Sequence, residues 1–330
     1  MKLTIRDIAK MANVSPTAVS FVINKKGSIS DETRRRIEEV IRQTGFRPSI
    51  NSRRLSAKKS FNICVVMDVG ASLFSDMFYL GVTKGIQQEA SALGYNIVLT
   101  DFSGSMPEIV LNRDTDGVIF FQDLESNMFD IVRGLSVPFV VADSHISHAP
   151  YPTVGIDNQR AAHAAIKHLL DCGHRDIAFL GPKNYPHLFE STHSGYNEAH
   201  MDSGLIPQKS RIYESDETTT SAGATMAMIL DAKPWPTAVF CPGDRQAIGA
   251  MLRAQELGAR VPEDISFMSI DDTMLCRYVR PQMTTVHIDM EQLGVHAMRL
   301  LHDQIDGKPT DNIILPMDEV VERDSVRRIG

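Results

Sequence analysis

The sequence is poor in cysteine and has no long apolar run. Its cysteines, Cys64, Cys172, Cys241 and Cys276, lie far apart and form no CxxC pair. This pattern favours reduced thiols over a disulfide or zinc framework. No run approaches the roughly 18 apolar residues of a membrane span. The first residues, MKLTIRDIAK, lack the apolar core of a secretory signal. We therefore expect a cytoplasmic protein without a structural metal.

Motifs for nucleotide binding and catalysis are also missing. There is no glycine-rich dinucleotide fingerprint and no GKS or GKT run. Asp271 and Asp272 could form a carboxylate pair for acid–base work or a metal, but no third ligand stands at a useful spacing. His174 stands between a helix end and a strand, where a cap or turn role is the simpler interpretation. We expect no enzyme, no catalytic residue and no cofactor.

The overall charge of −7 conceals a strong asymmetry. Residues 1–60 contain 14 Lys and Arg against 5 Asp and Glu, whereas the remaining residues contain 20 against 36. A small basic head on an acidic body is typical of nucleic-acid binders. A basic tail that is merely solvated is the alternative, and apolar periodicity in this segment disfavours it. A chain of 330 residues predicts two or three domains.

Residues 4–24 predict two short helices joined by a tight turn. Ile5, Ile8, Ala9 and Ala12 recur at helical spacing and form one apolar stripe. A second helix begins after Ser15, which suits an N-cap, and its outward face comprises Pro16, Thr17, Ser20, Phe21 and Asn24. This is the helix-turn-helix pattern of DNA-binding heads. On this stretch alone, an ordinary helical hairpin remains a rival.

A third helix and a basic segment complete the head. The helix runs from a cap at Ser30 to a stop at Gly45. Residues 47–60 are basic and compatible with a helix, but Leu55 is their one large apolar side chain besides Ile50. Such a segment is either a flexible linker or one that becomes helical against DNA.

From Phe61 onward, buried strands alternate with amphipathic helices. NICVVMD, DGVIFFQ, DIAFLGP and DISFMSIDD are near-continuous apolar strands, and the intervening stretches have helical periodicity. Repeated units of this kind predict parallel sheets covered by helices on both faces. We expect two doubly wound α/β lobes with a ligand at the carboxyl ends of the strands.

Together the segments TIRDIAKMANVSPTAVSFVIN and SDETRRRIEEVIRQTGFRPS, with Leu55, resemble the lactose-repressor/galactose-repressor (LacI/GalR) family of bacterial regulators. The resemblance covers essentially the whole chain. It implies a helix-turn-helix head at 1–46, a hinge helix at 47–60 and an effector-binding and dimerisation domain at 61–330 of the periplasmic-binding-protein type I fold. The N-lobe would comprise about 61–158 and 288–317, and the C-lobe about 159–287 and 318–330.

The resemblance also implies contacts with DNA. Pro16, Thr17 and Phe21 occupy base-reading positions, and Leu55 matches a leucine that wedges into the minor groove. Phe21 is a departure, because arginine or histidine is frequent there; a phenyl ring can pack on a thymine methyl but cannot donate to guanine. The full expected set is Thr4, Ser15, Pro16, Thr17, Ser20, Phe21, Asn24, Ser28, Asn51, Arg54 and Leu55.

The family's effector pocket maps onto the ends of strands in the body. Thr192 replaces a usual arginine and Gly243 replaces a usual asparagine, so the family does not identify the effector; His187, His193 or Arg245 could supply other donors. Asp143 and Asp68 could instead only cap helices. The expected set is Asp68, Ser72, Leu73, Phe74, Asp143, Ile156, Thr192, Gly243, Asp271 and Met290.

The resemblance implies a sequence-specific DNA-binding transcriptional regulator, a repressor that acts as a homodimer on a near-palindromic operator. A small molecule between the lobes, a sugar or sugar derivative, would control operator affinity. The alternatives are a non-sugar effector or control by a partner protein. A solute-binding protein is a remote alternative, disfavoured by the basic head and the absent signal. No apolar heptad tail follows the VERDSVRR segment, so we expect a dimer without a tetramerisation helix.

Overall fold

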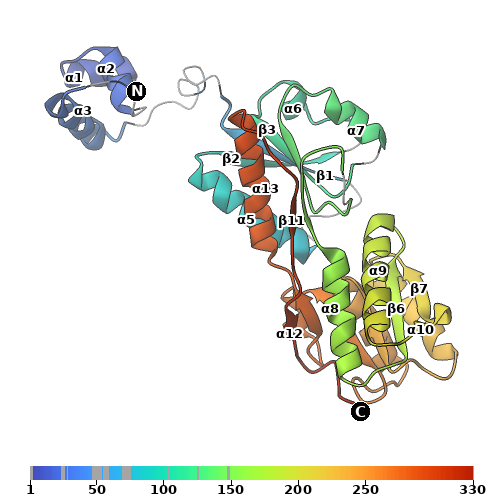
Figure 1. The fold of residues 1–330 in the computed structure, drawn as a ribbon. Helices are drawn as coiled ribbons and strands as arrows, with labels where there is room; N and C mark the ends of the chain where they lie inside the picture. Colours follow the sequence, from blue (N-terminus) through green and yellow to red (C-terminus); the bar gives the residue numbers. More distant parts are fainter. Residues whose placement is uncertain are drawn as a thin grey trace. The chain divides into compact units, whose positions relative to one another are not determined.

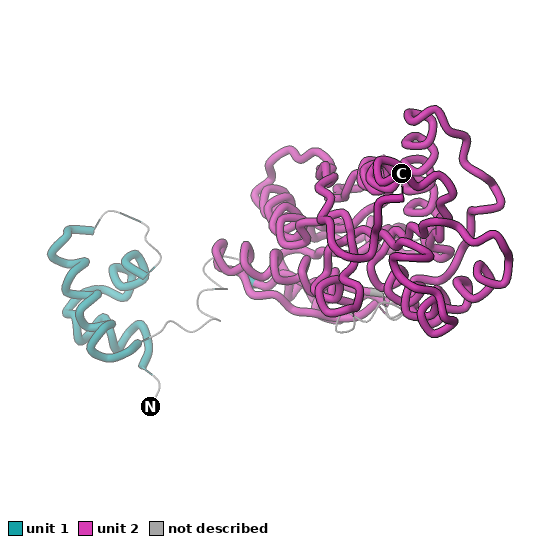
Figure 2. Tube along the Cα trace, turned by 90° about the horizontal axis from the view of Figure 1, so that it is seen from below, with its two compact units in different colours: residues 1–61 teal, residues 62–330 magenta. Residues whose placement is uncertain are grey.

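The computed structural model describes residues 3–23, 27, 29–46, 54, 59–68, 76–102, 105–124, 126–146 and 149–329. The chain divides into two compact units, Met1–Phe61 and Asn62–Gly330, shown in different colours in Figure 2. Several expected site residues lie outside the described residues: Asn24, Ser28, Asn51, Leu55, Ser72, Leu73 and Phe74. Asp68 is described only as the last residue of a strand, without its side chain.

The first unit contains three helices, α1 (Ile5–Met11), α2 (Pro16–Ile23) and α3 (Asp31–Thr44). Thr4 caps α1 in a reciprocal capping box with Asp7, and Ser30 caps α3. Gly45 ends α3 in the left-handed conformation that glycine tolerates best. The helices enclose a small core of Ile8, Ala9, Ala12, Val19, Val22, Ile37 and Phe46. The predicted helix-turn-helix head is confirmed.

The first lobe of the second unit is a parallel sheet. In the described residues its strands follow the order β2-β1-β3-β4-β5-β11, with these bounds: β1 Asn62–Asp68, β2 Asn96–Phe102, β3 Gly117–Phe121, β4 Phe139–Ala142, β5 Thr153–Ile156 and β11 Ile313–Leu315. Helices α5 (Met77–Ala92) and α13 (Met290–Ile305) lie side by side on one face, and α6 (Glu108–Leu111) and α7 (Ser126–Arg133) lie on the other (Figure 1).

Alternation along β1 shows why both faces are covered. Ile63, Val65 and Met67 belong to the core beneath α5 and α13, whereas Cys64 and Val66 belong to the core on the α6 side. Because successive side chains of a strand point to opposite faces, a strand that is apolar throughout needs helices on both sides. The predicted doubly wound architecture is confirmed.

The second lobe repeats this plan. Its described strands follow the order β7-β6-β8-β9-β10-β12, and only β12 is antiparallel. Their bounds are β6 Ile177–Pro182, β7 Ile212–Ser215, β8 Ala238–Phe240, β9 Ser266–Asp271, β10 Thr284–His287 and β12 Val320–Val321. Helices α8 (Asn158–Asp171) and α9 (Pro186–Asp202) cover one face, and α10 (Thr219–Asp231) and α11 (Asp244–Glu256) cover the other. Two short elements, η2 (Lys209–Arg211) and α12 (Leu275–Tyr278), complete the lobe.

The chain passes between the two sheets at three places, after β5, after β10 and between β11 and β12. This arrangement brings the strand ends of both lobes toward one cleft. The four cysteines are free and buried. Among the described residues, no helix is long and apolar enough to span a membrane.

Candidate functional site: the outward face of α2 and an interlobe cleft

The outward face of α2 is accessible in the head. Pro16, Thr17 and Phe21 are exposed, and Phe21 retains 40% of its surface, unusual for a large apolar ring. The backbone N–H of Ala18 donates to Ser15 Oγ at 3.1 Å, so this hydroxyl caps α2. Thr4 is also exposed, and its hydroxyl donates to Asp7 at 2.7 Å. Ser20 and Arg54 are partly buried.

Gly27 fixes the position of the Phe21 ring. A Cβ built on Gly27 would lie 2.6 Å from Phe21 Cδ2, so the glycine backbone lies directly against the ring. The φ angle of Gly27 is +77°, a conformation that other residues rarely adopt. A large apolar side chain on the outward face of α2 is therefore held by contact within the head.

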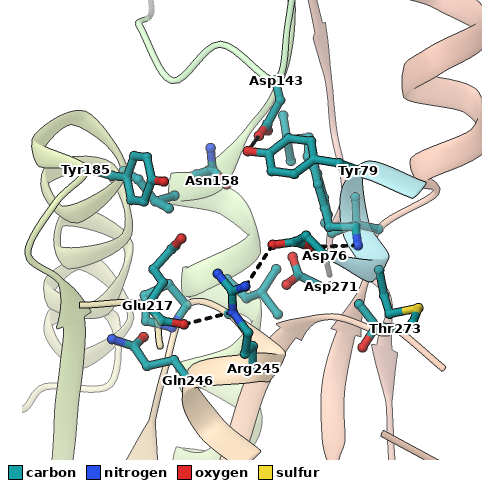
Figure 3. A pocket seen from close by; sticks show the side chains of 18 of the residues that line it. Asp76, Tyr79, Asp143, Asn158, Tyr185, Glu217, Arg245, Gln246, Asp271 and Thr273 are labelled. Carbon is teal, nitrogen blue, oxygen red and sulfur yellow. Dashed lines mark hydrogen bonds and ion pairs between the residues drawn. The ribbon is translucent and has the colours of Figure 1, made fainter. Parts of the chain in front are cut away.

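A cleft between the two lobes is the candidate ligand site of the body (Figure 3). The empty space between its lining residues is about 830 Å³, which includes open solvent at its mouth. Gln122, Asp143 and Ile156 follow or end strands of the first lobe, while Glu217 and Asp271 do so in the second. This is the edge at which doubly wound sheets bind ligands.

Three residues at these strand ends have unusual backbone conformations. The φ angles of Gln122, Asp143 and Asp271 are +65°, +62° and +122°, although none is glycine. Such conformations cost free energy and gather at functional sites. Their shared location at the cleft favours this surface as the working site of the body.

In the first lobe, a hydrogen-bond chain positions Asp143. Tyr79 donates its hydroxyl to Asp143 Oδ2 at 3.0 Å, and Gln122 Nε2 donates to the Tyr79 oxygen at 2.6 Å. Burial raises the pKa of Asp143 to about 6, although His145 and the Tyr79 hydrogen bond act in the opposite direction. Asp143 is thus a buried acceptor and does not act as a helix cap.

In the second lobe, Asp271 is held by the first turn of α11. The backbone N–H of Asp244 donates to Asp271 Oδ2 at 3.3 Å. The buried Asp244 carboxylate accepts from Ser269 at 2.5 Å and from the Thr273 backbone N–H at 2.6 Å. These hydrogen bonds fix the start of α11 beside Asp271. Burial, and then the neighbouring Asp244 charge, raise the pKa of Asp271 well above its ordinary value.

The neighbouring Asp272 does not form a carboxylate pair with Asp271. Asp272 makes ion pairs with Arg323 and with His287, the latter at 3.1 Å. His174 is fully buried between Thr237 and the Arg327 carbonyl, each at 3.0 Å from a ring nitrogen. Within the described part of the chain, no group of three or more His, Cys, Asp or Glu side chains could hold a metal ion.

The cleft contains some of the expected effector residues and omits others. Asp143, Ile156, Gly243 and Asp271 line it. Thr192 is fully buried and donates its hydroxyl to the Leu188 carbonyl at 2.6 Å, and Met290 packs against Gly81; neither lines the cleft. Of the suggested substitute donors, Arg245 lines the cleft, whereas His187 and His193 do not.

Five polar residues that line the cleft were not among the expected effector residues. Asp76, Tyr79, Gln122, Tyr185 and Glu217 all line the cleft. Asp76 carried a signal in the sequence, because it precedes the α5 helix as an N-cap. Glu217 carried none, since it lies in a loop between β7 and α10 that resembles any polar connection.

A basic helix-turn-helix head joined to a two-lobed ligand-binding body defines a DNA-binding regulator. The family model described as bacterial regulatory proteins, lacI family, matches residues 4–49, and the periplasmic binding protein-like domain matches residues 166–326. The chain is 32% identical to catabolite control protein A of Priestia megaterium, over 98% of each sequence. The chain belongs to the lacI family and is a transcriptional regulator.

Solved structures have the same fold over the whole chain. The transcriptional regulator CelR in complex with cellobiose is 27% identical, with a TM-score of 0.70 and coverage of 98% of this chain and 99% of that one. The lac repressor dimer bound to operator and the anti-inducer ONPF is 24% identical, with a TM-score of 0.82 and coverage of 99% and 100%. The family predicted from the sequence is confirmed.

Proposed function

We propose that this chain is a repressor that binds a near-palindromic operator as a homodimer and is controlled by a small molecule in the interlobe cleft. The two heads of the dimer read the two half-sites. The ligand acts because its affinity differs between two lobe arrangements, which changes the affinity of the heads for operator. The protein works in the cytoplasm and catalyses no reaction.

The observation that carries this proposal is the composition of the cleft. Both lobes contribute polar groups at strand ends, and the strained residues Gln122, Asp143 and Asp271 are among them. A molecule bound there contacts both lobes at once, so it is sensitive to the angle between them. The cellobiose complex of the related regulator CelR supports a ligand rich in hydroxyl groups.

Two experiments test the proposal. Selection of bound sequences from random DNA should return two inverted half-sites, as a symmetric dimer requires. At the Phe21 contact we expect a thymine, and Phe21→Ala should weaken that preference. A thermal-shift screen of sugars and their derivatives should then find a compound that changes operator affinity. Recovery of no common sequence would refute the DNA-binding role proposed for the head.

A non-sugar effector or a partner protein is the second candidate for control. The loss of the family's arginine at Thr192 and asparagine at Gly243 favours a ligand that differs from the usual ones. If no small molecule stabilises the body, control by a partner protein is the better account.

A further inference from the structure

The charges that face the cleft are strongly unbalanced. Among its described lining residues are four carboxylates, Asp76, Asp143, Glu217 and Asp271, against one guanidinium, Arg245, and the imidazole of His145. No lysine lines it in the part of the chain that is described. Residues 69–75, which follow β1 in sequence, contain no charged residue of either sign.

The single guanidinium is already engaged. Arg245 Nε donates to the Glu217 backbone carbonyl at 2.9 Å, and Nη1 lies 3.4 Å from Asp76 Oδ2. His145 has its Nδ1 3.2 Å from the Asn158 amide and its Nε2 3.9 Å from Asp143. The protein therefore supplies no uncommitted cation, among its described side chains, to balance the remaining carboxylates.

Two acceptors in the cleft have no donor. The Glu217 carboxylate has neither a hydrogen bond nor an ion pair with any described residue. Figure 3 shows it reaching toward the space below Tyr185. Gln246, which is 1% exposed, has no partner for its Oε1 among the described residues, although its Nε2 donates to Ser215 at 2.7 Å. A buried acceptor without a donor, such as Gln246 Oε1, is costly, and the partly exposed Glu217 carboxylate has no donor among the described residues; each favours a ligand that donates.

We propose that the ligand of this cleft is a small hydroxylated amine, such as an amino sugar, whose protonated amine binds at Glu217. This inference rests on the proposed role of the cleft as the effector site. A neutral polyol could donate to each acceptor, but it supplies no positive charge to this acidic lining. An ammonium supplies three donors and the missing positive charge together.

Titration of the cleft agrees with this chemistry. Burial raises the pKa of Glu217 to about 7, with His145 and Arg245 acting in the opposite direction and Asp76 and Asp143 adding to the rise. A bound cation favours the ionised carboxylate, so binding should release protons and strengthen as the pH rises from 6 toward 7.5. Hydrogen bonds from a neutral sugar carry no such charge and should show little dependence on pH over this range.

The test is calorimetry on the full-length protein with matched probes. Each set contains an aldose, its 2-amino-2-deoxy derivative and the N-acetylated derivative, in the gluco, galacto and manno series. At pH 7.5 we expect the amine of one set to bind about tenfold or more tightly than both of its partners. Glu217→Gln should remove most of this advantage, whereas Glu214→Gln, on the exposed side of the same strand–loop segment, should keep it.

Two results overturn the inference: equal or tighter binding of the neutral member in every set, or no binding of any amine at millimolar concentration. The operator assay separates this inference from the proposed function. If a neutral sugar binds and changes operator affinity, the proposed regulation through the cleft is supported and the proposed amine ligand is refuted. If an amine binds at Glu217 and operator affinity is unchanged, the ligand class stands and the proposed regulation fails.

Discussion

Asp76 and Arg245 face each other across the cleft, with Asp76 Oδ2 3.4 Å from Arg245 Nη1. Asp76 precedes α5 in the first lobe, and Arg245 lies in the first turn of α11 in the second. A second contact, from Gln122 Nε2 to the Tyr185 hydroxyl at 3.1 Å, joins the lobes nearby. Both contacts join one lobe to the other, so they depend on the angle between the lobes, and the same side chains line the ligand site.

Breaking this ion pair should alter ligand binding by a small, measurable amount. Because the Arg245 side chain is 40% exposed, solvent screens the pair, and we expect a coupling of about 0.5–1 kcal/mol. A double-mutant cycle with Asp76→Asn and Arg245→Met, read by calorimetry of ligand binding, measures it. Additive effects of the two substitutions would show that the pair does not couple the lobes.

Glu217 should make the body less stable as the pH rises. Its folded pKa of about 7 exceeds the ordinary value of 4.5, so its contribution to stability is fully present below pH 4.5 and is lost as the pH rises through 7. The pKa of Glu217 is lowered by the neighbouring His145 and Arg245 and raised by Asp76 and Asp143. At pH 8, Glu217→Gln should raise the free energy of unfolding by about 2 kcal/mol, with little gain at pH 4.

Denaturant unfolding of the ligand-free protein at both pH values measures this effect. Glu214→Gln is the matched control, because Glu214 lies on the exposed side of the neighbouring strand, and its loss should give the same small change at both pH values. An equal gain for Glu217→Gln at pH 4 and pH 8 would contradict the predicted titration.

Substitution of Gly27 should damage DNA reading more than stability. In Gly27→Ala, the new Cβ would meet the Phe21 ring at 2.6 Å and displace it from the reading face. Gly45→Ala is the control, since its φ of +61° imposes a similar backbone strain with no atom within 4 Å of the added carbon. Each should lose about 1 kcal/mol of stability, but only Gly27→Ala should lose sequence preference at the Phe21 contact.

Operator selection with both variants, beside their thermal unfolding, checks this prediction. Equal loss of preference in Gly27→Ala and Gly45→Ala would show that backbone strain, and not the position of the ring, is responsible.

The architecture could be predicted from the sequence because local signals agree with the tertiary structure. Ser30 and Gly45 mark the ends of α3, and the unbroken apolar character of β1 and β6 requires sheets covered on both faces. Asp143 and Asp271 could be placed in the cleft because carboxyl ends of parallel strands meet at one edge.

The remaining cleft residues depend on how the two lobes approach each other. The resemblance to the family predicted Thr192 in the pocket, yet its side chain turns back onto its own helix and donates to the Leu188 carbonyl. Glu217 lies in the loop between β7 and α10, and no periodicity in the sequence predicts the path of that loop. Tyr79 looks in the sequence like the other buried residues of α5, and only its hydrogen bond to Asp143 in the structure marks it as part of the cleft. Sequence spacing predicts which residues share a face, but not which loop reaches across a cleft.

The most direct test of the central claim is the salt dependence of binding to the upstream DNA of the chain's own gene, compared with a scrambled duplex of equal length. We predict that the full-length protein binds the natural sequence at least about a thousandfold more tightly near physiological salt, and that affinity falls steeply as salt rises. The ligand found in the calorimetric screen should shift this affinity. Equal affinity for the natural and scrambled duplexes across the salt series would contradict the account.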